Sequence, residues 1–262
     1  MQMPVNTFKQ ALRNGTRQIG LWMGLTDPCA AEMLAGAGFD WLLIDGEHSP
    51  NDLRSVLAQL QAAAAYPVHC IVRPVNADAD LIKRYLDIGV QSLIVPMIET
   101  PADAARVVAA TRYPLRGHRG VASATTRASR WGRIDRYSER SDAQMCVVVQ
   151  IESVRGLENL EAIAAVDGVD GVFFGPADLA ASMGLLGRPG DPKVQDALLG
   201  GIATVARAGK AAGTLTTDRK LARRYLDQGA LFVAVGVDTT LMVKAASELA
   251  AEFIPPGPRA PG

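Results

Sequence analysis

Two kinds of hydrophobic pattern alternate along this chain of 262 residues. Short, nearly continuous apolar runs such as WLLID, SLIVP and CVVVQIE are followed by longer segments in which apolar residues recur with the period of a helix. Continuous apolar runs are typical of parallel strands that are covered by protein on both faces. The alternation therefore predicts strand–helix units in a parallel sheet.

Eight such units can be counted. The predicted strands are 19–23, 41–45, 70–73, 92–96, 146–152, 171–175, 212–216 and 232–237. The predicted helices that follow them are 28–35, 50–64, 77–88, 101–110, 154–164, 192–207, 218–228 and 238–250. Eight units favour a closed (β/α)8 barrel, or TIM barrel, and leave an open doubly wound sheet as the alternative. No GxGxxG opens the first unit and no GxxxxGK[ST] occurs, so nucleotide binding has no support.

Two segments interrupt this rhythm. Segment 113–144 has seven arginines between Arg116 and Arg140, and loops of this length in a barrel are usually lids, binding loops or subunit contacts. The end of the chain, 254–262, is rich in proline and glycine and is predicted to be disordered. We therefore expect one barrel domain over 1–253.

Charge and composition narrow the class of partner. Lys plus Arg and Asp plus Glu both number 27, so no net field favours nucleic acid or an acidic membrane surface. The start of the chain has no apolar signal region, and no stretch approaches the roughly 20 apolar residues that span a bilayer. We expect a cytoplasmic protein whose partner is a small molecule.

Candidate chemistry gathers where the predicted strands end, which is where (β/α)8 barrels carry their reacting groups. Glu152 and Asp178 follow consecutive strands, so their carboxylates can approach one point. Two carboxylates without Cys or His suit a hard cation that keeps several positions for water and substrate. The alternative is that Glu152 caps a helix and Asp178 forms a turn.

Three further residues suggest acid–base and anion chemistry. His48 lies in the loop after the second strand, where its pKa suits proton transfer, and Asp45 could orient its ring; a plain surface position is the alternative. Arg73 ends the third strand, where it could stabilise a developing anion. Its alternative is an ion pair with Asp45 or Asp87, which an arriving substrate could redirect.

Several motifs together resemble the 4-hydroxy-2-oxo-heptanedioate aldolases, the class II pyruvate aldolases. They are DWLLIDGEHSPND, VRP, VPMIET, RGVASATTRASRWGR, VQIES, GVDGVFFGPADLAASMG and ALFVAVGVDTTLM, and the resemblance runs from about Asn6 to Phe253. It implies a carbon–carbon lyase of aromatic catabolism on a (β/α)8 barrel. It also implies a homohexamer, a trimer of dimers, in which the last helix is often exchanged between subunits.

The resemblance assigns a role to each matching position. Glu152 and Asp178 would bind a divalent cation, Mg²⁺, Mn²⁺ or Co²⁺, and Arg73 would hold the keto oxygen of pyruvate. His48, oriented by Asp45, would transfer the proton, with Asp87 in support. The remaining positions would bind substrate or line the pocket: Gln150, Ala177, Trp22, Leu215 and Val237.

The aldehyde partner is less defined. Ala122 stands where the heptanedioate enzymes would have glycine, and Thr125 and Thr216 replace more apolar residues at positions expected to shape the aldehyde side. Succinic semialdehyde is one candidate, and the aldehyde released from a 2-keto-3-deoxy sugar acid is another. Two rival functions are another carbon–carbon lyase or mutase that uses a metal-stabilised enolate, and a non-catalytic barrel.

Overall fold

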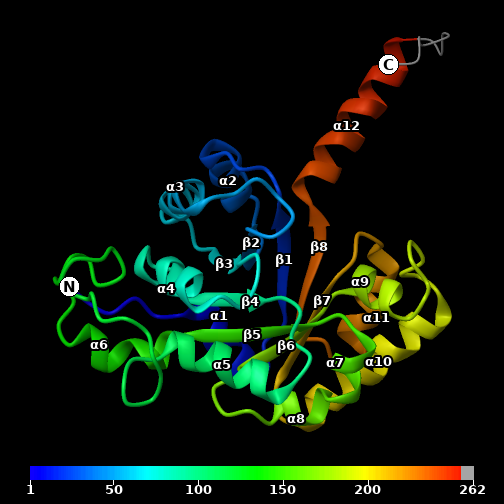
Figure 1. The fold of residues 1–262 in the computed structure, drawn as a ribbon. Helices are drawn as coiled ribbons and strands as arrows, with labels where there is room; N and C mark the ends of the chain where they lie inside the picture. The colour runs from blue at the N-terminus through cyan, green and yellow to red at the C-terminus, as the bar shows by residue number, and fades with distance from the viewer. Residues whose placement is uncertain (255–262) are drawn as a thin grey trace.

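A computed structural model describes residues 1–254; residues 255–262, which hold most of the predicted disordered tail, lie outside the described residues. Eight parallel strands form a closed barrel in sequence order, and pairing of Gln18 with Phe232 joins the last strand to the first. The predicted (β/α)8 barrel is confirmed and the open sheet is wrong (Figure 1). The strands are β1 (Gln18–Met23), β2 (Trp41–Asp45), β3 (His69–Arg73), β4 (Ser92–Val95), β5 (Cys146–Ile151), β6 (Gly171–Phe174), β7 (Ala211–Leu215) and β8 (Phe232–Val237).

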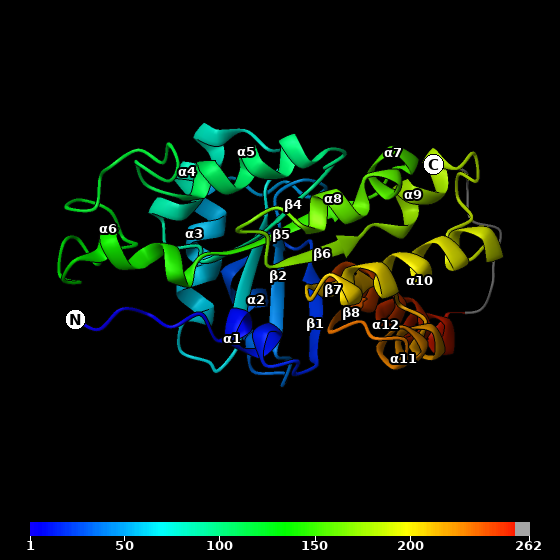
Figure 2. The ribbon, with the colours of Figure 1, turned by 90° about the horizontal axis from the view of Figure 1, so that it is seen from below.

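Helices surround the strands, as Figure 2 shows from below. They are α1 (Thr7–Arg13), α2 (Pro28–Ala35), α3 (Leu53–Ala63), α4 (Ala79–Asp87), α5 (Pro101–Thr111), α6 (Tyr137–Arg140), α7 (Val154–Glu158), α8 (Leu160–Ala164), α9 (Pro176–Ser182), α10 (Pro192–Arg207), α11 (Arg219–Asp227) and α12 (Asp238–Phe253), with a 3₁₀ turn η1 (Ser141–Gln144). The predicted helix 154–164 is divided at Asn159 into α7 and α8. The short elements α1, α6, α9 and η1 were not predicted. Among the described residues, no helix is both long enough and apolar enough to cross a membrane.

Capping residues fix where the helices begin. Asp52 accepts hydrogen bonds from the first turn of α3 while the Ser55 hydroxyl bonds back to it, and Thr100 and Asp103 form the same reciprocal box before α5. Such caps satisfy backbone N–H groups that would otherwise lack partners. The loops that lead into α3 and α5 therefore end at a defined residue at the carboxyl-terminal end of the barrel.

The interior of the barrel is filled by a column of aromatic rings. Phe8 from α1 closes the amino-terminal end and lies 5.9 Å from Trp41 and 5.5 Å from Phe232 between ring centroids. Phe173 lies 6.0 Å from Phe232, and Trp22 lies 5.5 Å from Phe173 toward the carboxyl end. This aromatic column makes the barrel a packed core and supports the side chains at its mouth from below.

Two glycines make room for the column. A Cβ at Gly20 would lie 2.1 Å from the Trp41 ring, and one at Gly213 would lie 2.3 Å from the Phe232 ring. Neither ring could keep its position if those strands carried larger residues, because the barrel interior has no spare volume.

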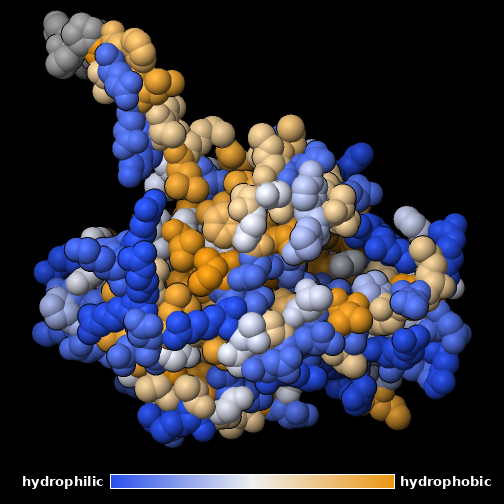
Figure 3. All heavy atoms as spheres, turned by 180° about the vertical axis from the view of Figure 1, so that it is seen from behind, coloured by the Kyte–Doolittle hydropathy of each residue, from blue (hydrophilic) through white to orange (hydrophobic). Residues whose placement is uncertain are grey.

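Helix α12 follows the last strand but does not pack along the barrel. It projects away from the body of the molecule (Figure 1), and only its first residue, Asp238, is buried. Figure 3 shows the projecting helix with apolar side chains over much of its surface. Its exposed large apolar residues are Leu241, Met242, Val243, Leu249 and Phe253.

The predicted arginine-rich segment packs against the chain's own amino terminus. The terminal amino group donates to the carbonyl of Arg133, and the Asn6 side chain bonds to the carbonyls of Gln91 and Gln144. A small separate core beneath it consists of Met3, Tyr113, Ala128, Ile134 and Tyr137. The segment is thus an ordered extension beside the barrel rather than a loose lid.

Candidate active site

A buried charge cluster occupies the adjacent ends of β2 and β3. Asp45 and Arg73 are register partners on β2 and β3. The guanidinium donates two parallel hydrogen bonds to the carboxylate, from Nε to Oδ1 (2.9 Å) and from Nη2 to Oδ2 (2.7 Å), and this pair is called the Asp45 fork below. Trp22 Nε1 donates to the same carboxylate at 3.0 Å, and its ring lies 4.7 Å below the guanidinium carbon. Burial raises the pKa of Asp45, but the hydrogen bond and charge of Arg73 outweigh this and lower it overall. An ion pair, which was the alternative interpretation of Arg73, is therefore present, and its partner is Asp45.

Glu47 completes this cluster, although the sequence assigned it no role. Its Oε2 lies 2.8 Å from Arg73 Nη1, and the side chain is only 14% exposed. Burial raises the pKa of Glu47 above its ordinary value, in spite of the nearby charge of Arg73. The run DGEH placed both acids after one strand, but only the fold shows that they share one guanidinium.

His48 is placed differently from the expectation. Its side chain is 67% exposed, and Nε2 lies 4.0 Å from Glu47 Oε2. The Asp45 carboxylate accepts a hydrogen bond from the backbone N–H of His48 at 3.4 Å rather than from its ring. The prediction that Asp45 orients the ring directly is wrong for this conformation, because Arg73 and Trp22 occupy the carboxylate. Asp45 instead fixes the turn that presents the histidine.

Glu152 is a buried carboxylate that immediately follows β5. It accepts hydrogen bonds from Met97 N at 2.8 Å and from Gln150 Nε2. Burial raises its pKa; these two bonds oppose the rise, and the charges of Asp178 and Glu47 add to it. None of these neighbours is a cation. Burial of an ionised carboxylate without a positive charge beside it costs free energy of folding.

Two backbone features keep Glu152 in place. Gly175 follows β6, and a Cβ there would lie 2.6 Å from Glu152 Oε2 and 3.3 Å from Gln150 Nε2. Met97, which donates to the same carboxylate, has the left-handed backbone value φ +56°, rare for a residue other than glycine. Strain of this kind tends to be retained at functional sites.

Ala177 and Asp178 lie in the first turn of α9 and are exposed. Backbone N–H groups in a first turn have no acceptor within the helix, so they are available to a ligand. Asp178 is close enough to raise the pKa of both Glu152 and Glu47. No group of three or more His, Cys, Asp or Glu residues that could hold a metal occurs within 1–254.

The predicted pocket-lining residues meet at the top of the aromatic column. Trp22 is 6% exposed, and the half-buried Leu215 and Val237 pack against the same cluster. Thr216 follows Leu215 and is half-buried at the same end of the barrel. Asp238 is a structural residue there, because its carboxylate accepts the N–H groups of two residues after β1.

Asp87, Ala122 and Thr125 do not reach this mouth within one chain. Asp87 ends α4, which runs back along the barrel, and it contacts Arg119 of the arginine-rich segment at 3.4 Å. The backbone carbonyl of Asp87 accepts from Ala128 in that segment, which also holds Ala122 and Thr125. Asp87 therefore lies against the arginine-rich segment, which also carries Ala122 and Thr125, and not among the side chains at the ends of β2, β3 and β5.

The arrangement combines a held guanidinium, a solvent-accessible imidazole and a carboxylate pair above an apolar floor. It can stabilise negative charge that develops on a substrate oxygen and can exchange a proton beside it. Asp45, His48 and Arg73 lie at the ends of β2 and β3, and Glu152 and Asp178 follow β5 and β6 at the same end of the barrel.

Comparison with known proteins gives consistent results. Residues 18–245 match the family described as HpcH/HpaI aldolase/citrate lyase. The chain is 61% identical over 253 residues to a hydroxypyruvate/pyruvate aldolase of Paraburkholderia phytofirmans, a match that covers 97% of this chain and 95% of that protein. It is 56% identical over 248 residues to a 4-hydroxy-2-oxo-heptane-1,7-dioate aldolase of Shigella sonnei, with 95% of each chain covered.

A solved structure agrees as well. The crystal structure of an HpcH/HpaI aldolase/citrate lyase family protein from Burkholderia cenocepacia superposes with a TM-score of 0.92 at 43% sequence identity. The match covers 95% of this chain and 99% of that one.

Proposed function

The chain belongs to the HpcH/HpaI aldolase/citrate lyase family and is a carbon–carbon lyase, and we propose that it is a divalent-metal-dependent aldolase that reversibly joins pyruvate to an aldehyde. One observation carries this proposal. The same barrel mouth contains the Arg73 guanidinium, which Asp45 fixes in place, and the buried carboxylate of Glu152, which has no cationic neighbour. A reaction through an enolate needs positive charge beside the substrate oxygen that becomes negative, and Arg73 together with a cation at Glu152 would supply it.

The residues at Glu152 and Asp178 fit a hard divalent cation. Both are oxygen donors, Glu152 lacks a cationic neighbour, and Gly175 leaves clear the space around its Oε2 that a Cβ would fill. When bound, such an ion would supply Lewis-acid stabilisation of negative charge at the C2 oxygen of the substrate. Mg²⁺, Mn²⁺ and Co²⁺ all suit this donor set.

Arg73 would stabilise the same oxygen. Its Nε and Nη2 are bound to Asp45 and its Nη1 faces Glu47, so the guanidinium is fixed in one orientation before substrate arrives. A fixed donor needs little reorganisation as charge develops, which favours the transition state. A substrate oxygen that displaces Glu47 from Nη1 would leave the Asp45 fork intact.

His48 would move the proton. Cleavage of a 4-hydroxy-2-oxo acid requires removal of the proton from the C4 hydroxyl as the C3–C4 bond breaks, and addition in reverse requires its return. The imidazole is exposed at the mouth, and Glu47 at 4.0 Å can stabilise its charged form. Transfer through one water molecule would suit this position.

The carboxylate of pyruvate would lie toward β5 and β6. First-turn N–H groups at Ala177 and Asp178 can donate to it, and Gln150 adds a polar side chain from β5. Trp22, Leu215 and Val237 would form the apolar floor beneath the methyl group.

The aldehyde substrate is open between two classes. Succinic semialdehyde follows from the relative named for heptanedioate, and a hydroxylated aldehyde corresponds to the sugar-acid alternative. Relatives named hydroxypyruvate/pyruvate aldolases, 58–62% identical to this chain, support hydroxypyruvate as a second nucleophilic substrate. Thr216 at the mouth could hydrogen-bond an additional hydroxyl group.

Two features support assembly into the predicted homohexamer, a trimer of dimers. The apolar surface of α12 has no cover within its own chain, as expected for a helix that packs on a second copy. Asp87 and the segment with Ala122 and Thr125 lie away from their own mouth, so any part they have in a site would be played in a neighbouring subunit.

Exchange of the methyl protons of pyruvate in D₂O tests the central step. We expect proton NMR to show exchange that depends on Mg²⁺ or Mn²⁺ and is lost in Glu152→Ala. Glu158→Ala, a change at an exposed position on α7, serves as the matched control and should exchange normally. No exchange with any divalent metal would contradict a pyruvate enolate and favour another lyase or mutase chemistry. Failure to cleave or condense any of a panel of oxo acids and aldehydes would favour a non-catalytic barrel.

A further inference from the structure

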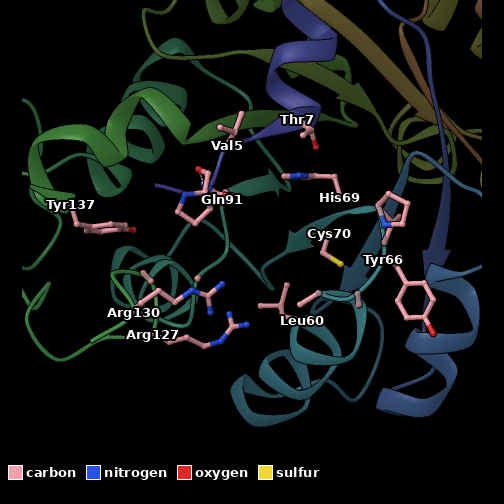
Figure 4. A pocket seen from close by; sticks show the side chains of 17 residues that line it. Val5, Thr7, Leu60, Tyr66, His69, Cys70, Gln91, Arg127, Arg130 and Tyr137 are labelled. Atoms are coloured by element: carbon pink, nitrogen blue, oxygen red, sulfur yellow. Dashed lines mark hydrogen bonds between the residues drawn. The ribbon is translucent and has the colours of Figure 1, made fainter. Parts of the chain in front are cut away.

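A cavity of about 470 Å³ opens at the amino-terminal end of the barrel, away from the side chains at the strand ends. It lies between α3, the start of β3, the first residues of the chain and the arginine-rich segment. In Figure 4, Arg127 and Arg130 reach in from one side, while His69 and Cys70 approach from β3. Its volume is typical of small-molecule pockets, which span about 300–1,000 Å³.

The positive charge in this cavity has no acidic counterpart. None of the 17 lining residues is Asp or Glu, and no carboxylate of residues 1–254 pairs with Arg127 or Arg130. Other arginines of the same segment do have acidic partners, namely Arg116, Arg119 and Arg136. The two guanidiniums, which have no carboxylate partner among residues 1–254, thus face a concave space.

The backbone holds the side chain of Arg127 in place. Arg127 Nη1 donates to the carbonyl of Ile88 at 2.6 Å, and a Cβ at Gly89, where φ is +102°, would lie 2.7 Å from that nitrogen. Arg130 itself has φ +55°, a left-handed value that is rare for arginine. Burial lowers the pKa of Arg127, and repulsion by the nearby charge of Arg130 lowers it further. An anion between them would turn this repulsion into attraction.

The opposite wall is uncharged. Leu60, Val68 and Cys70 give it an apolar surface. His69 stacks on Phe8, its Nε2 lies 2.8 Å from Ser92 Oγ, and burial lowers its pKa to about 4, so the ring is neutral at pH 7. The cavity therefore has a cationic side and an apolar side.

We propose that this cavity binds a small organic anion, with a carboxylate or phosphate group between Arg127 and Arg130 and a short apolar body against Leu60, Val68 and Cys70. The site is separate from the catalytic mouth and does not rest on the proposed reaction. Charge-assisted hydrogen bonds from two guanidiniums fix the head group, and the apolar wall selects against a bare inorganic ion.

Isothermal titration of the whole protein with hexanoate, hexyl phosphate and 1-hexanol tests the proposal without any substitution. We expect both anions to bind, and 1-hexanol, which has the same apolar body, to bind at least about tenfold more weakly. Preference for hexanoate or for hexyl phosphate would distinguish a carboxylate from a phosphate ligand. Equal affinity for 1-hexanol, or no binding of either anion, would overturn the proposal.

Variants locate the site. Arg130→Gln should weaken anion binding at least about tenfold, whereas Arg133→Gln, a control in the same segment with its side chain over Trp131, should bind normally. Arg73→Lys should also bind normally, because the catalytic mouth is not involved. Loss of binding in Arg73→Lys alone would place the anion at that mouth and refute the proposal. Sedimentation that shows subunit dissociation in Arg130→Gln, together with no anion binding to the unaltered protein, would identify the cavity as an interface between copies and equally refute it.

Discussion

Replacement of Gly175 by alanine tests the carboxylate site without removing any functional side chain. The new Cβ would lie 2.6 Å from Glu152 Oε2, whereas ordinary contact begins at 3.4 Å, so the oxygen must retreat by about 0.8 Å. Ligand distances in metal sites hold to within about 0.2 Å, so a shift of this size removes Glu152 from productive coordination.

We expect Gly175→Ala to weaken Mn²⁺ binding by about 10- to 100-fold, the range seen when groups that orient a metal ligand are disturbed. Overpacking should cost about 1–3 kcal/mol of unfolding free energy. Titration calorimetry with Mn²⁺ alone measures the first effect, and denaturant unfolding of the metal-free protein measures the second.

Gly200→Ala provides the matched control. Gly200 lies within α10, and a Cβ there would meet nothing within 4 Å, so alanine should leave metal binding unchanged and add about 0.5–1 kcal/mol to stability. If Gly175→Ala bound Mn²⁺ as tightly as the unaltered protein, Glu152 would not be a ligand in the position described.

Further predictions concern the guanidinium, acid stability and α12. Arg73→Lys should lower kcat by about 100-fold or more and change the melting temperature little, because a point charge cannot reproduce the Asp45 fork; near-normal turnover would contradict its role. Burial lowers the pKa of His69 to about 4 from 6.5, so protonation of the unfolded state should remove up to about 3 kcal/mol of stability as pH falls from 6.5 to 4. Denaturant titrations of His69→Gln should show a shallower loss over that range, and an unchanged slope would exclude this histidine as the cause. Leu249→Glu on α12 should reduce the assembly to smaller species in analytical ultracentrifugation, whereas Lys244→Gln, an exposed charge on the same helix, should not.

The sequence predicts the barrel because its strands are buried on both faces and leave unmistakable apolar runs. The bounds of β2 and β8 agree with the predicted strands, β7 begins and ends one residue earlier than predicted, and each of the others differs by one residue at one end. Short elements escape this reasoning: α9 has seven residues and α6 has four, too few for a helical period to emerge. The projection of α12 also leaves no local signal, because the apolar content of this segment does not distinguish a helix that packs on the barrel from one that projects.

The site is predictable to the level of strand ends and no further. That rule brings Arg73, Glu152 and Asp178 to one rim, because parallel strands end together. It cannot tell which carboxylate a guanidinium will choose, so the engagement of Asp45 by Arg73 and the approach of Glu47 to His48 came only from the fold. The left-handed backbone of Met97 is equally hidden, since methionine does not signal a positive φ.

The aromatic column from Phe8 to Trp22 separates the two ends of the molecule by a layer of close-packed rings. Substitutions at the catalytic mouth and at the opposite cavity share no contacting side chain, so their effects on stability should add to within about 0.3–0.5 kcal/mol. Because the effects are independent, substitutions can accumulate at one end of the barrel without compensating substitutions at the other. Selection for a new aldehyde could therefore remodel the loops above the column while whatever occupies the arginine-lined cavity continues to bind.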